Sequence, residues 1–241
     1  MRRVWYGPDD GTPTNFAILV KRVIHLLKSK KVLVTAGPTH EYLDDIRFIG
    51  NKSSGKQGAE IAKYLHKLEA DVTLIIGPVN IELSGLGKVL RVETAIQMSE
   101  AVIESGPFDI AICAAAVGDW RPKEKAKTKI KKISGDNPPI LELIENPDIL
   151  RNICNSKNRP DLVIGFAAET DDLLANARLK LKNKGCDWIV ANRVNAEFHH
   201  MGGEENEVTI IKKDEEINLA RQSKERIAKL ICEKIVEEIT A

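Results

Sequence analysis

Short, almost purely apolar segments alternate with segments of helical spacing along most of the chain. The apolar segments span residues 32–35, 72–76, 110–117, 162–166 and 188–191. Continuous apolar runs of this kind are typical of strands that are buried on both faces of a parallel sheet. The segments between them repeat apolar residues as amphipathic helices do, and span residues 59–68, 95–103 and 173–181. The alternation predicts a doubly wound, Rossmann-like α/β fold with a mostly parallel sheet, in which ligands bind beyond the carboxyl ends of the strands.

The start of the chain does not follow this alternation. Residues 1–30 begin with Pro, Gly and Asp and continue into a predicted helix from Phe16 to Leu27. We therefore predict a leader over residues 1–30 and one α/β domain over residues 31–241. The residues of the leader indicate no chemical role, and a helix that packs on the domain or on a second copy is the simplest interpretation.

A second interruption lies in the middle of the chain. Residues 120–143 are too long for an ordinary connection between a strand and a helix. Together with residues 208–211 they predict antiparallel strands that project from the sheet. An amphipathic helix is expected from Ala220 to Ile239, at the end of the domain.

The charge of the chain is almost balanced, with 36 Lys and Arg against 35 Asp and Glu and a formal net charge of +1. Such a chain has no overall field to hold a nucleic acid or an anionic membrane, and 5% aromatic residues are too few for a base-stacking platform. No apolar run approaches the ~20 residues of a membrane span, and Asp9 and Asp10 stand where a signal peptide would be apolar. The 4 cysteines are too far apart for a zinc motif or a disulfide framework. We predict a cytoplasmic protein with no nucleic-acid partner and no membrane partner.

One short segment is strongly basic. Residues 121–132 contain seven lysines and arginines against the single acid Glu124, and a lysine stands at every second position from 123 to 131. In an extended strand these lysines would point to one side, and their repulsion would keep the segment mobile until a polyanion binds. A solvated surface arm explains the same run, so the charge alone leaves both interpretations open.

Two loops have the composition of helix starts. The loop from Asn51 to Gly58 holds hydroxyl groups, glycines and lysines before a predicted helix, although it does not match the P-loop pattern. Unpaired N–H groups and the helix dipole would favour a phosphate there, whereas a serine N-cap explains the loop equally well. The second loop runs from Asn146 through Pro147 and Asp148 to Ile149. Taken alone it indicates ordinary capping, with Asn as N-cap and Pro at the first helical position.

Three further side chains are candidates for a nucleotide site. Lys180 and Lys184 lie one helical turn apart, either as favourable cations near a helix C-terminus or as a clamp on phosphates. Asp119 closely follows the buried segment 110–117. A carboxylate at this place either accepts hydrogen bonds from ribose hydroxyls or caps its own loop.

Several motifs occur in an order and spacing that are together highly specific. They are TAGPT at 35–39, IRFIGNKSSGK at 46–56, CAAAVGDWRP at 113–122, KIKK at 129–132, NPDI at 146–149 and GFAAET at 165–170. Over residues 31–239 the chain resembles phosphopantothenoylcysteine synthetase, the phosphopantothenate–cysteine ligase of coenzyme A biosynthesis. In bacteria and archaea this domain usually follows a flavin-dependent decarboxylase. Because only residues 1–30 precede it here, we expect no flavin, and a separate decarboxylase protein is a candidate partner.

The resemblance implies that residues 31–241 form a nucleotide-binding ligase domain. Such enzymes use a nucleoside triphosphate, generally CTP in prokaryotes, together with Mg²⁺. The carboxylate of 4′-phosphopantothenate attacks the α-phosphate, which gives an acyl-cytidylate and pyrophosphate. The amine of L-cysteine then displaces CMP and forms an amide. The resemblance also implies a homodimer whose projecting antiparallel strands pair across a two-fold axis, and it leaves the metal ligands unassigned.

The resemblance assigns roles to individual residues. Lys129, in the basic segment, would neutralise charge in the first half-reaction, and Asn51 would handle the acyl-nucleotide in the second. Substrate binding is expected at Arg47, Asn51, Ser53, Ser54 and Gly55. Nucleotide contacts are expected at Cys113, Ala114, Ala115, Asp119, Lys129, Asn146, Pro147, Asp148, Ile149, Phe166, Lys180 and Lys184.

Three residues depart from the pattern of the family. Gln57 stands where Met is usual, a change that is expected to alter only packing. Gly118 stands where Ala or Ser is common, and Arg193 stands where an Asp usually follows Ala-Asn. A cation beside the nucleotide keeps ATP open as the alternative to CTP. Two other functions also stay open. The missing G-x-G-x-x-G counts against an NAD(P)-dependent oxidoreductase on the same fold, and the presence of Asn51 and Lys129 counts against a non-catalytic nucleotide-binding subunit.

Overall fold

The computed structural model describes residues 27–28, 30–131, 137–193 and 203–240. Of the predicted leader, only Leu27, Lys28 and Lys30 belong to this part, and the side chain of Leu27 is fully buried in the core. The rest of the leader, including most of its expected helix, lies outside the described residues. The division into a leader and a domain stays a prediction.

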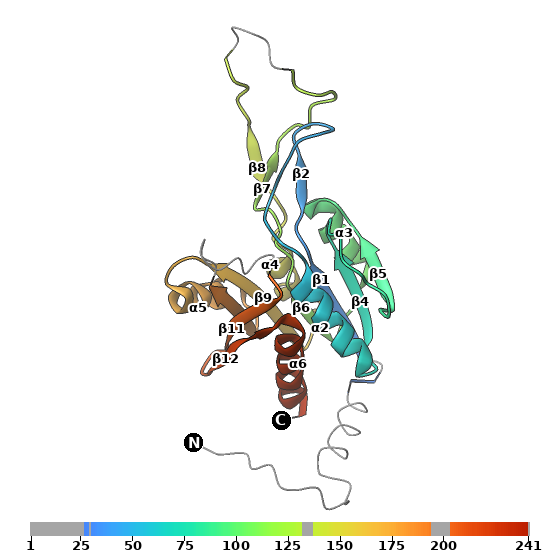
Figure 1. Cartoon of the computed structure of the whole chain (residues 1–241), viewed down its shortest axis with the longest axis vertical. Coiled ribbons are helices and arrows are strands. Elements are labelled where there is room, and N and C mark those ends of the chain that lie inside the picture. The colour runs from blue at the N-terminus through green and yellow to red at the C-terminus, as the bar shows by residue number, and fades with distance from the viewer. Residues whose placement is uncertain (1–26, 29, 132–136, 194–202, 241) are drawn as a thin grey trace, which may run out of the picture.

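An eight-stranded sheet forms the centre of the fold, in the order β12-β11-β10-β9-β6-β1-β4-β5 (Figure 1). Its parallel strands are β1 (Lys31–Ala36), β4 (Asp71–Ile76), β5 (Lys88–Arg91), β6 (Ile110–Cys113), β9 (Leu162–Glu169) and β10 (Trp188–Arg193). The antiparallel strands β11 (Glu205–Ile211) and β12 (Glu216–Ser223) complete one edge. The predicted mostly parallel α/β sheet is confirmed. Because the strand order reverses between β1 and β6, a crevice is expected at their carboxyl ends.

Helices cover both faces of the sheet. One face carries α2 (Lys56–Lys67) and α6 (Lys224–Thr240), and the other carries α3 (Ala95–Ser105), α4 (Ile149–Cys154) and α5 (Leu173–Lys184). Alternate residues of β1 enter the two cores, with Val32 and Val34 on the α2–α6 side and Leu33 on the other. Burial on both faces explains why the strands are continuous apolar runs. Within the described part of the chain, no helix combines the length and the apolarity needed to cross a bilayer.

Pairing across the sheet corrects several boundaries expected from local patterns. The strand expected over residues 110–117 ends at Cys113, where its pairing with β1 and β9 ends. Residues 208–211 belong to β11 in the main sheet and not to a projection. The last helix begins at Lys224 instead of Ala220, because residues up to Ser223 belong to β12 and pair with β11.

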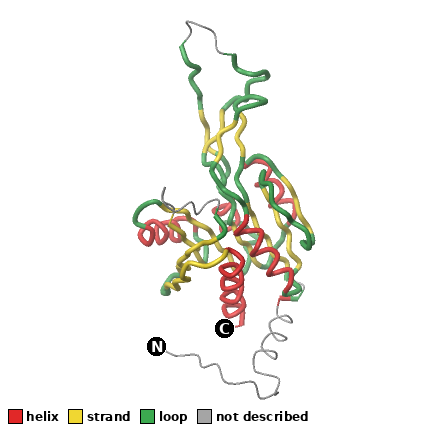
Figure 2. The backbone as a smooth tube through the Cα atoms, in the orientation of Figure 1, coloured by secondary structure: helices red, strands yellow, loops and turns green. Residues whose placement is uncertain are grey.

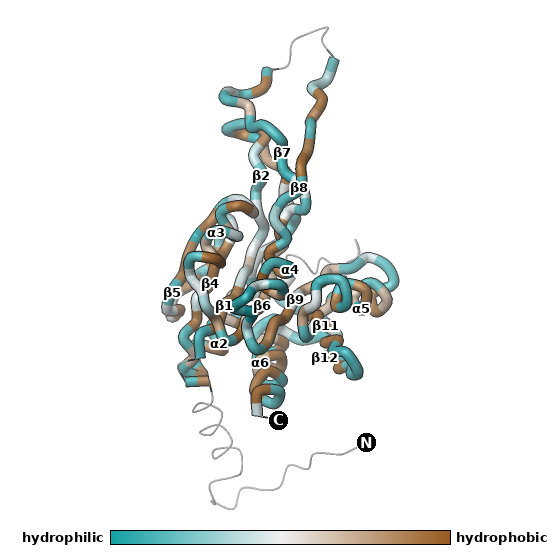
Figure 3. The backbone as a smooth tube through the Cα atoms, turned by 180° about the vertical axis from the view of Figure 1, so that it is seen from behind, coloured by the Kyte–Doolittle hydropathy of each residue, from teal (hydrophilic) through white to brown (hydrophobic). Residues whose placement is uncertain are grey.

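Two two-stranded ribbons project from the carboxyl side of the sheet, and together we call them the arm (Figures 1 and 2). One ribbon pairs β2 (His40–Tyr42) with β3 (Phe48–Gly50), the other pairs β7 (Trp120–Pro122) with β8 (Leu143–Glu145), and β2 contacts β7. The projection expected from residues 120–143 is therefore confirmed. Large apolar side chains stay exposed on the arm, and hydrophobic colour is seen along the described residues that lead into β8 (Figure 3). They are Ile46, Phe48, Trp120, Ile140, Leu141 and Leu143.

Candidate active site

The carboxyl ends of β1, β6, β9 and β10 open into a cleft of about 710 Å³. The first turns of α2 and α4 and one side of α5 complete its walls. Most of the residues expected to bind substrate or nucleotide line this cleft, although they come from distant parts of the sequence. They are Asn51, Ser53, Ser54, Gly55, Cys113, Ala114, Ala115, Asp119, Asn146, Pro147, Asp148, Ile149, Phe166, Lys180 and Lys184.

Helix α2 begins at the cleft with amide groups that are not paired. Its N-cap, Gly55, has a left-handed backbone (φ 70°) and offers no side-chain cap. The hydroxyls of Ser53 and Ser54 instead accept hydrogen bonds from the amides two residues on, at 3.3 and 3.5 Å. The N–H groups of Gln57 and Gly58 have no acceptor among the described residues. The interpretation as a simple serine N-cap is wrong, and the helix offers free N–H groups and a positive dipole end to an anion.

Glycines allow α2 to begin this close to the sheet. A Cβ atom on Gly58 would lie 2.7 Å from the Cβ of Ala36, at the end of β1. A Cβ atom on Gly55 would lie 3.3 Å from the Cα of Gly37, and the positive φ of Gly55 disfavours any other residue. Both glycines are therefore needed to hold the helix start over the strand end.

Asn51 ties the loop before α2 to the segment after β6. Its Nδ2 donates to the carbonyl oxygens of Val117, at 3.0 Å, and Ala116, at 3.5 Å. Because these bonds occupy the amide hydrogens, Oδ1 is the atom that remains for a ligand. An acceptor at this place suits an N–H donor and does not suit an oxyanion.

The backbone after β6 forms the floor of the cleft. The amides of Ala114 and Ala115 donate to the carbonyl oxygen and the hydroxyl of Thr35, at 3.0 and 3.4 Å. These amides are therefore not available to a nucleotide. Burial raises the pKa of the Cys113 thiol far above its ordinary value, so it stays protonated and is a poor nucleophile.

The start of α4 differs from its expected cap. Asp148 is the N-cap, and its carboxylate accepts a hydrogen bond from a first-turn amide at 3.0 Å. The prediction of Asn146 as cap and Pro147 as first helical residue is wrong, because the helix starts later. Asn146 instead donates to the carbonyl oxygen of Gly118, at 2.8 Å, and accepts from Arg121, at 3.2 Å. This loop joins the base of the arm to the cleft.

Lys180 and Lys184 both reach the cleft from α5. The Nζ of Lys180 donates to the carbonyl oxygen of Phe166 at 3.1 Å, and burial lowers the pKa of this lysine. Lys184 forms an ion pair with Asp148. The carboxylate of Asp119 accepts no hydrogen bond from any described residue. The two ammonium groups and this carboxylate are thus placed to contact one polar ligand.

Arg47 and Lys129 lie on the arm and do not line the cleft. The guanidinium of Arg47 binds the buried carboxylate of Asp44 through Nε, at 3.0 Å, and Nη2, at 2.5 Å. This contact holds the pKa of Asp44 well below its usual range. Arg47 also donates to the carbonyl oxygen of Ile130 at 2.6 Å, and the amide of Ile130 donates to Asp44 at 3.0 Å. The turn between β2 and β3 is therefore hydrogen-bonded to the backbone of Ile130, the residue next to Lys129.

The basic segment is not the one-sided array expected from its spacing, because the backbone leaves the strand conformation after β7. Lys123 pairs with Glu142 at 2.7 Å, and Lys125 pairs with Asp45 at 2.9 Å and lies over the ring of Tyr42. The remaining lysines of the described segment are exposed and form no ion pair with another described residue. They are Lys127, Lys129 and Lys131.

The sequence did not reveal the polar residues that close the α2–α6 end of the cleft. Gln57, Asn206 and Lys224 line this end, and the last two are 6% and 5% exposed. Lys52 and Asn192 also line the cleft. These residues share no local motif, since long-range pairing brings them together. One available signal was Asn206, a polar residue at an inward position of a strand whose other buried residues, Val208, Ile210 and Ile211, are apolar.

The described residues contain no group of three or more His, Cys, Asp or Glu side chains that could hold a metal ion. Mg²⁺ bound to nucleotide phosphates needs only one or two protein carboxylates. Asp119 and Asp148 are carboxylates that line the cleft, and Asp148 is already paired with Lys184. The metal ligands therefore stay unassigned.

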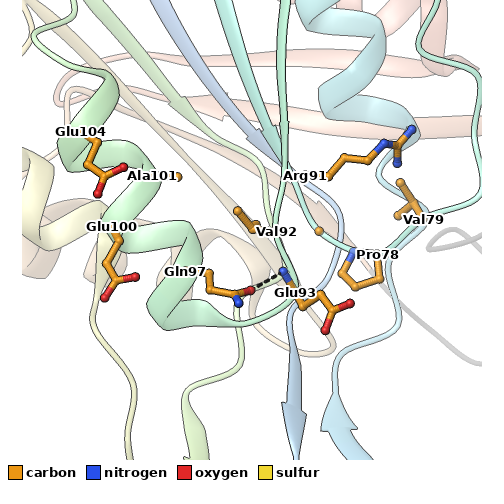
Figure 4. A pocket seen from close by; sticks show the side chains of 10 residues that line it. Pro78, Val79, Arg91, Val92, Glu93, Gln97, Glu100, Ala101 and Glu104 are labelled. Carbon is orange, nitrogen blue, oxygen red and sulfur yellow. Dashed lines mark hydrogen bonds between the residues drawn. The ribbon is translucent and has the colours of Figure 1, made fainter.

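A second hollow, of about 690 Å³, lies at the carboxyl ends of β4 and β5 beside α3. Figure 4 shows Glu93, Glu100 and Glu104 around it, with Arg91 farther along the wall. None of the predicted site residues lines this hollow. Its carboxylates make it unsuitable for a phosphate ligand.

A family model for the DNA/pantothenate metabolism flavoprotein C-terminal domain matches residues 27–239. The chain belongs to this family. The curated coenzyme A biosynthesis bifunctional protein CoaBC of Vibrio cholerae is 38% identical over 216 residues, which cover 89% of this chain and 54% of that protein. The protein of the same name from Borreliella burgdorferi is 40% identical over 207 residues, covering 85% of this chain and 52% of that protein. The chain spans about half the length of these relatives.

A solved structure of one relative agrees with the fold. The crystal structure of the C-terminal domain of a coenzyme A biosynthesis bifunctional protein CoaBC superposes with a TM-score of 0.74 at 35% identity. The match covers 89% of this chain and 98% of that domain. The chain therefore shares both the family and the fold of that domain.

The expectation that Gln57 alters only packing is wrong, because Gln57 lines the cleft, donates to the carbonyl oxygen of Lys224 and accepts from Asn206. The other two departures from the family pattern, Gly118 and Arg193, have little effect on the cleft. A Cβ atom on Gly118 would meet its nearest neighbour, the Cγ of Glu41, at 3.4 Å, so alanine would fit there without displacing the backbone. Arg193 is exposed at the end of β10 and does not line the cleft, although its neighbour Asn192 does. Arg193 itself therefore forms no part of the cleft wall, and the preference for CTP over ATP stays a prediction.

Proposed function

We propose that this chain is a phosphopantothenate–cysteine ligase, which joins 4′-phosphopantothenate and L-cysteine through an acyl-nucleotide in coenzyme A biosynthesis. Membership of the family and similarity to the C-terminal domain of CoaBC support the proposal. The observation that carries it is the cleft, in which Lys180, Lys184 and the open start of α2 surround one space. Transfer of a nucleotidyl group to a carboxylate needs positioning and cations and no protein nucleophile, which agrees with the protonated thiol of Cys113.

CTP is the proposed nucleotide and Mg²⁺ the proposed metal, with ATP as the alternative. In this proposal the free carboxylate of Asp119 accepts hydrogen bonds from the ribose, and Phe166 packs against the base or the sugar. Lys180 and Lys184 contact the phosphates, and the pairing of Lys184 with Asp148 is exchanged for a phosphate oxygen. The Oδ1 of Asn51 accepts a hydrogen bond from the attacking amine of cysteine.

Release of pyrophosphate tests the proposal. The protein should release pyrophosphate when it is incubated with 4′-phosphopantothenate, L-cysteine, Mg²⁺ and CTP, and less when ATP, GTP or UTP replaces CTP. No pyrophosphate with any of the four nucleotides would contradict a ligase. Saturable binding of NADH without binding of CTP would favour an oxidoreductase, and nucleotide binding without turnover would favour a non-catalytic subunit.

Two variants separate the half-reactions. Lys129→Gln should lose formation of the acyl-nucleotide, because it removes the cation proposed to neutralise the phosphates, whereas Lys127→Gln removes an equally exposed lysine of the same segment and should retain activity. Asn51→Asp should form the acyl-nucleotide and let it accumulate, because the carboxylate lacks the donor that holds Asn51 to Val117. Rapid-quench separation of pyrophosphate from released CMP measures both effects. Full activity of both variants would show that these residue assignments are wrong.

A homodimer is proposed through the arm. The exposed apolar side chains of Phe48, Trp120, Ile140 and Leu143 form the kind of surface that soluble proteins cover by association. Light scattering at micromolar concentration should give twice the mass of the chain, and a monomer mass would contradict the dimer. A separate decarboxylase as partner and a cytoplasmic location stay predictions.

A further inference from the structure

Lys129 lies in a short loop whose two ends are attached to another part of the arm. Before the loop, the amide of Ala126 donates to the carbonyl oxygen of Leu43 at 2.9 Å. After it, the N–H and the C=O of Ile130 are both hydrogen-bonded to the turn between β2 and β3. Ala126 and Ile130 are half-buried, whereas residues 127–129 between them are exposed. The loop 127–129 therefore has fixed ends and a free, basic middle.

Asp44 is the centre of this attachment. Its side chain is fully buried, although it is a carboxylate on a projecting arm. Its Oδ1 accepts from the amides of Ile46 and Arg47, at 2.9 Å each, and these bonds shape the turn. Its Oδ2 accepts from the guanidinium of Arg47 and from the amide of Ile130, at 3.0 Å. Asp44 therefore binds its own turn with one oxygen and the end of the loop with the other.

The two bonds to Ile130 restrain the peptide groups on both sides of this residue. Its N–H belongs to the planar peptide group that also contains the carbonyl of Lys129, and Asp44 holds this group directly. Its carbonyl oxygen belongs to the next peptide group and is held by Arg47, whose guanidinium is itself oriented by Asp44. Removal of the charge of Asp44 would therefore loosen both peptide groups, and with them the backbone that carries Lys129.

The charge of the loop explains why such an attachment is needed. Lys127 and Lys129 are exposed and form no ion pair with a described residue, so repulsion between them favours a mobile loop. Immobilising a mobile loop costs conformational entropy, and this cost slows a reaction when it falls on the step that needs the lysine in place. Asp44 holds the loop already in the folded protein, because a buried carboxylate that lost a donor would be destabilised.

We infer that Asp44 is a positioning residue for the formation of the acyl-nucleotide, because it holds the backbone that presents the ammonium group of Lys129. This rests on the proposed function, in which Lys129 neutralises charge in that step, and adds to it the residue that places the lysine. Asp45, the next residue, is the comparison within the same turn. Its carboxylate is exposed and forms a surface ion pair with Lys125 at 2.9 Å, of a kind that contributes little.

Rapid-quench kinetics of Asp44→Asn test this inference. Asparagine keeps the size of the side chain and one acceptor oxygen, but it removes the charge that binds Arg47. The rate of acyl-nucleotide formation should fall about ten- to hundredfold, the range expected when a catalytic group is no longer held in place. The KM for the nucleotide should stay within about twofold, and so should the rate at which L-cysteine consumes acyl-nucleotide that is supplied to the protein.

Asp45→Asn is the matched control, because it makes the same chemical change at the next position of the turn. It should leave both half-reactions within about twofold of wild type. An unchanged rate of acyl-nucleotide formation in Asp44→Asn would overturn the inference. Equal losses in both half-reactions would also overturn it, because they would indicate a general disturbance of the arm.

A double-mutant cycle with Lys129→Gln shows whether Asp44 acts through Lys129. Residual pyrophosphate release in single turnovers should be the same in Lys129→Gln and in the double variant, because the placement of the loop no longer matters once the ammonium group is gone. A further loss of about ten- to hundredfold in the double variant would overturn the inference, because Asp44 would then act independently of Lys129.

Hydrogen exchange in the wild-type protein keeps the inference independent of the folding of variants. The amides of Ala126 and Ile130 should exchange about tenfold more slowly than those of Lys127 and Lys129, which have no acceptor among the described residues. Equal exchange of Ile130 and Lys127 would overturn the inference. Slow exchange of Ile130 without any release of pyrophosphate would instead reject the proposed function and retain the attachment of the loop.

Discussion

Helices α2 and α3 both begin at the carboxyl edge of the sheet, but their first turns differ in whether the amide groups are paired. Helix α2 starts after a left-handed glycine, has no side-chain cap and leaves amides open to the cleft. In helix α3, by contrast, amides of the first turn are paired. Thr94 and Gln97 form a capping box, and Glu41 accepts a hydrogen bond from the amide of Ala95 at 3.0 Å. Lysines line the cleft beside α2, whereas glutamates line the hollow beside α3.

The contrast shows that a place at the carboxyl edge does not by itself create an anion site. The fold supplies the crevice and the helix dipole at both starts. Side chains then decide whether the amides stay free, and the charge of the lining residues decides which ligand is attracted. Each of the following variants changes one feature of this comparison, either at α2 and its cleft or at the start of α3.

Gly58→Val should have the largest effect. A side chain at this position collides with Ala36, so α2 has to move away from the end of β1. Overpacking of this kind costs about 1–3 kcal/mol of unfolding free energy, and displacement of catalytic groups by an ångström lowers activity about a hundredfold. Urea denaturation and pyrophosphate release measure the two effects. Gly87→Ala is the control, since its Cβ atom would meet nothing closer than 3.6 Å, and equal losses in both variants would disprove the role of close packing.

Lys180→Met should have a smaller effect, confined to the nucleotide. Loss of one charge-assisted contact should raise the nucleotide KM about ten- to hundredfold, while unfolding stays near wild type. Burial lowers the pKa of Lys180 below the ordinary 10.5. As the pH rises, Lys180 should therefore lose its positive charge at a lower pH than an exposed lysine would. The nucleotide affinity of the wild-type protein should fall at that same pH. The variant should lack this dependence. Glu100→Gln, in the hollow beside α3, should leave the nucleotide KM unchanged, and an equal rise there would contradict the distinction between the two sites.

Thr94→Ala should have the smallest effect and should act on stability alone. It opens the capping box of α3, which costs about 1 kcal/mol in thermal or urea unfolding. Pyrophosphate release should not change, because the hollow beside α3 takes no part in the proposed reaction. A fall in activity comparable to that of Gly58→Val would show that the start of α3 contributes to the site.

The sequence predicted the sheet and most of the cleft because both depend on local signals. Continuous apolar runs identified the buried strands, ordered motifs identified residues such as Asn51, and the one-turn spacing from Lys184 identified Lys180. Long-range pairing produced the differences. Residues 208–211 joined the main sheet through β10, and Lys224 entered the cleft through the hairpin of β11 and β12. Ion pairs with acids of other segments likewise divided the basic run into paired and free lysines.

The hairpin of β11 and β12 also makes one wall of the cleft depend on the end of the chain. β12 joins the sheet only through β11, and β11 only through β10. Helix α6 follows this hairpin and packs against α2 in the same core. Because a domain generally folds as one unit, a truncation within α6 removes the cover of α2 as well as the C-terminal segment. The last helix therefore belongs to the site as well as to the core, since its first residue, Lys224, lines the cleft.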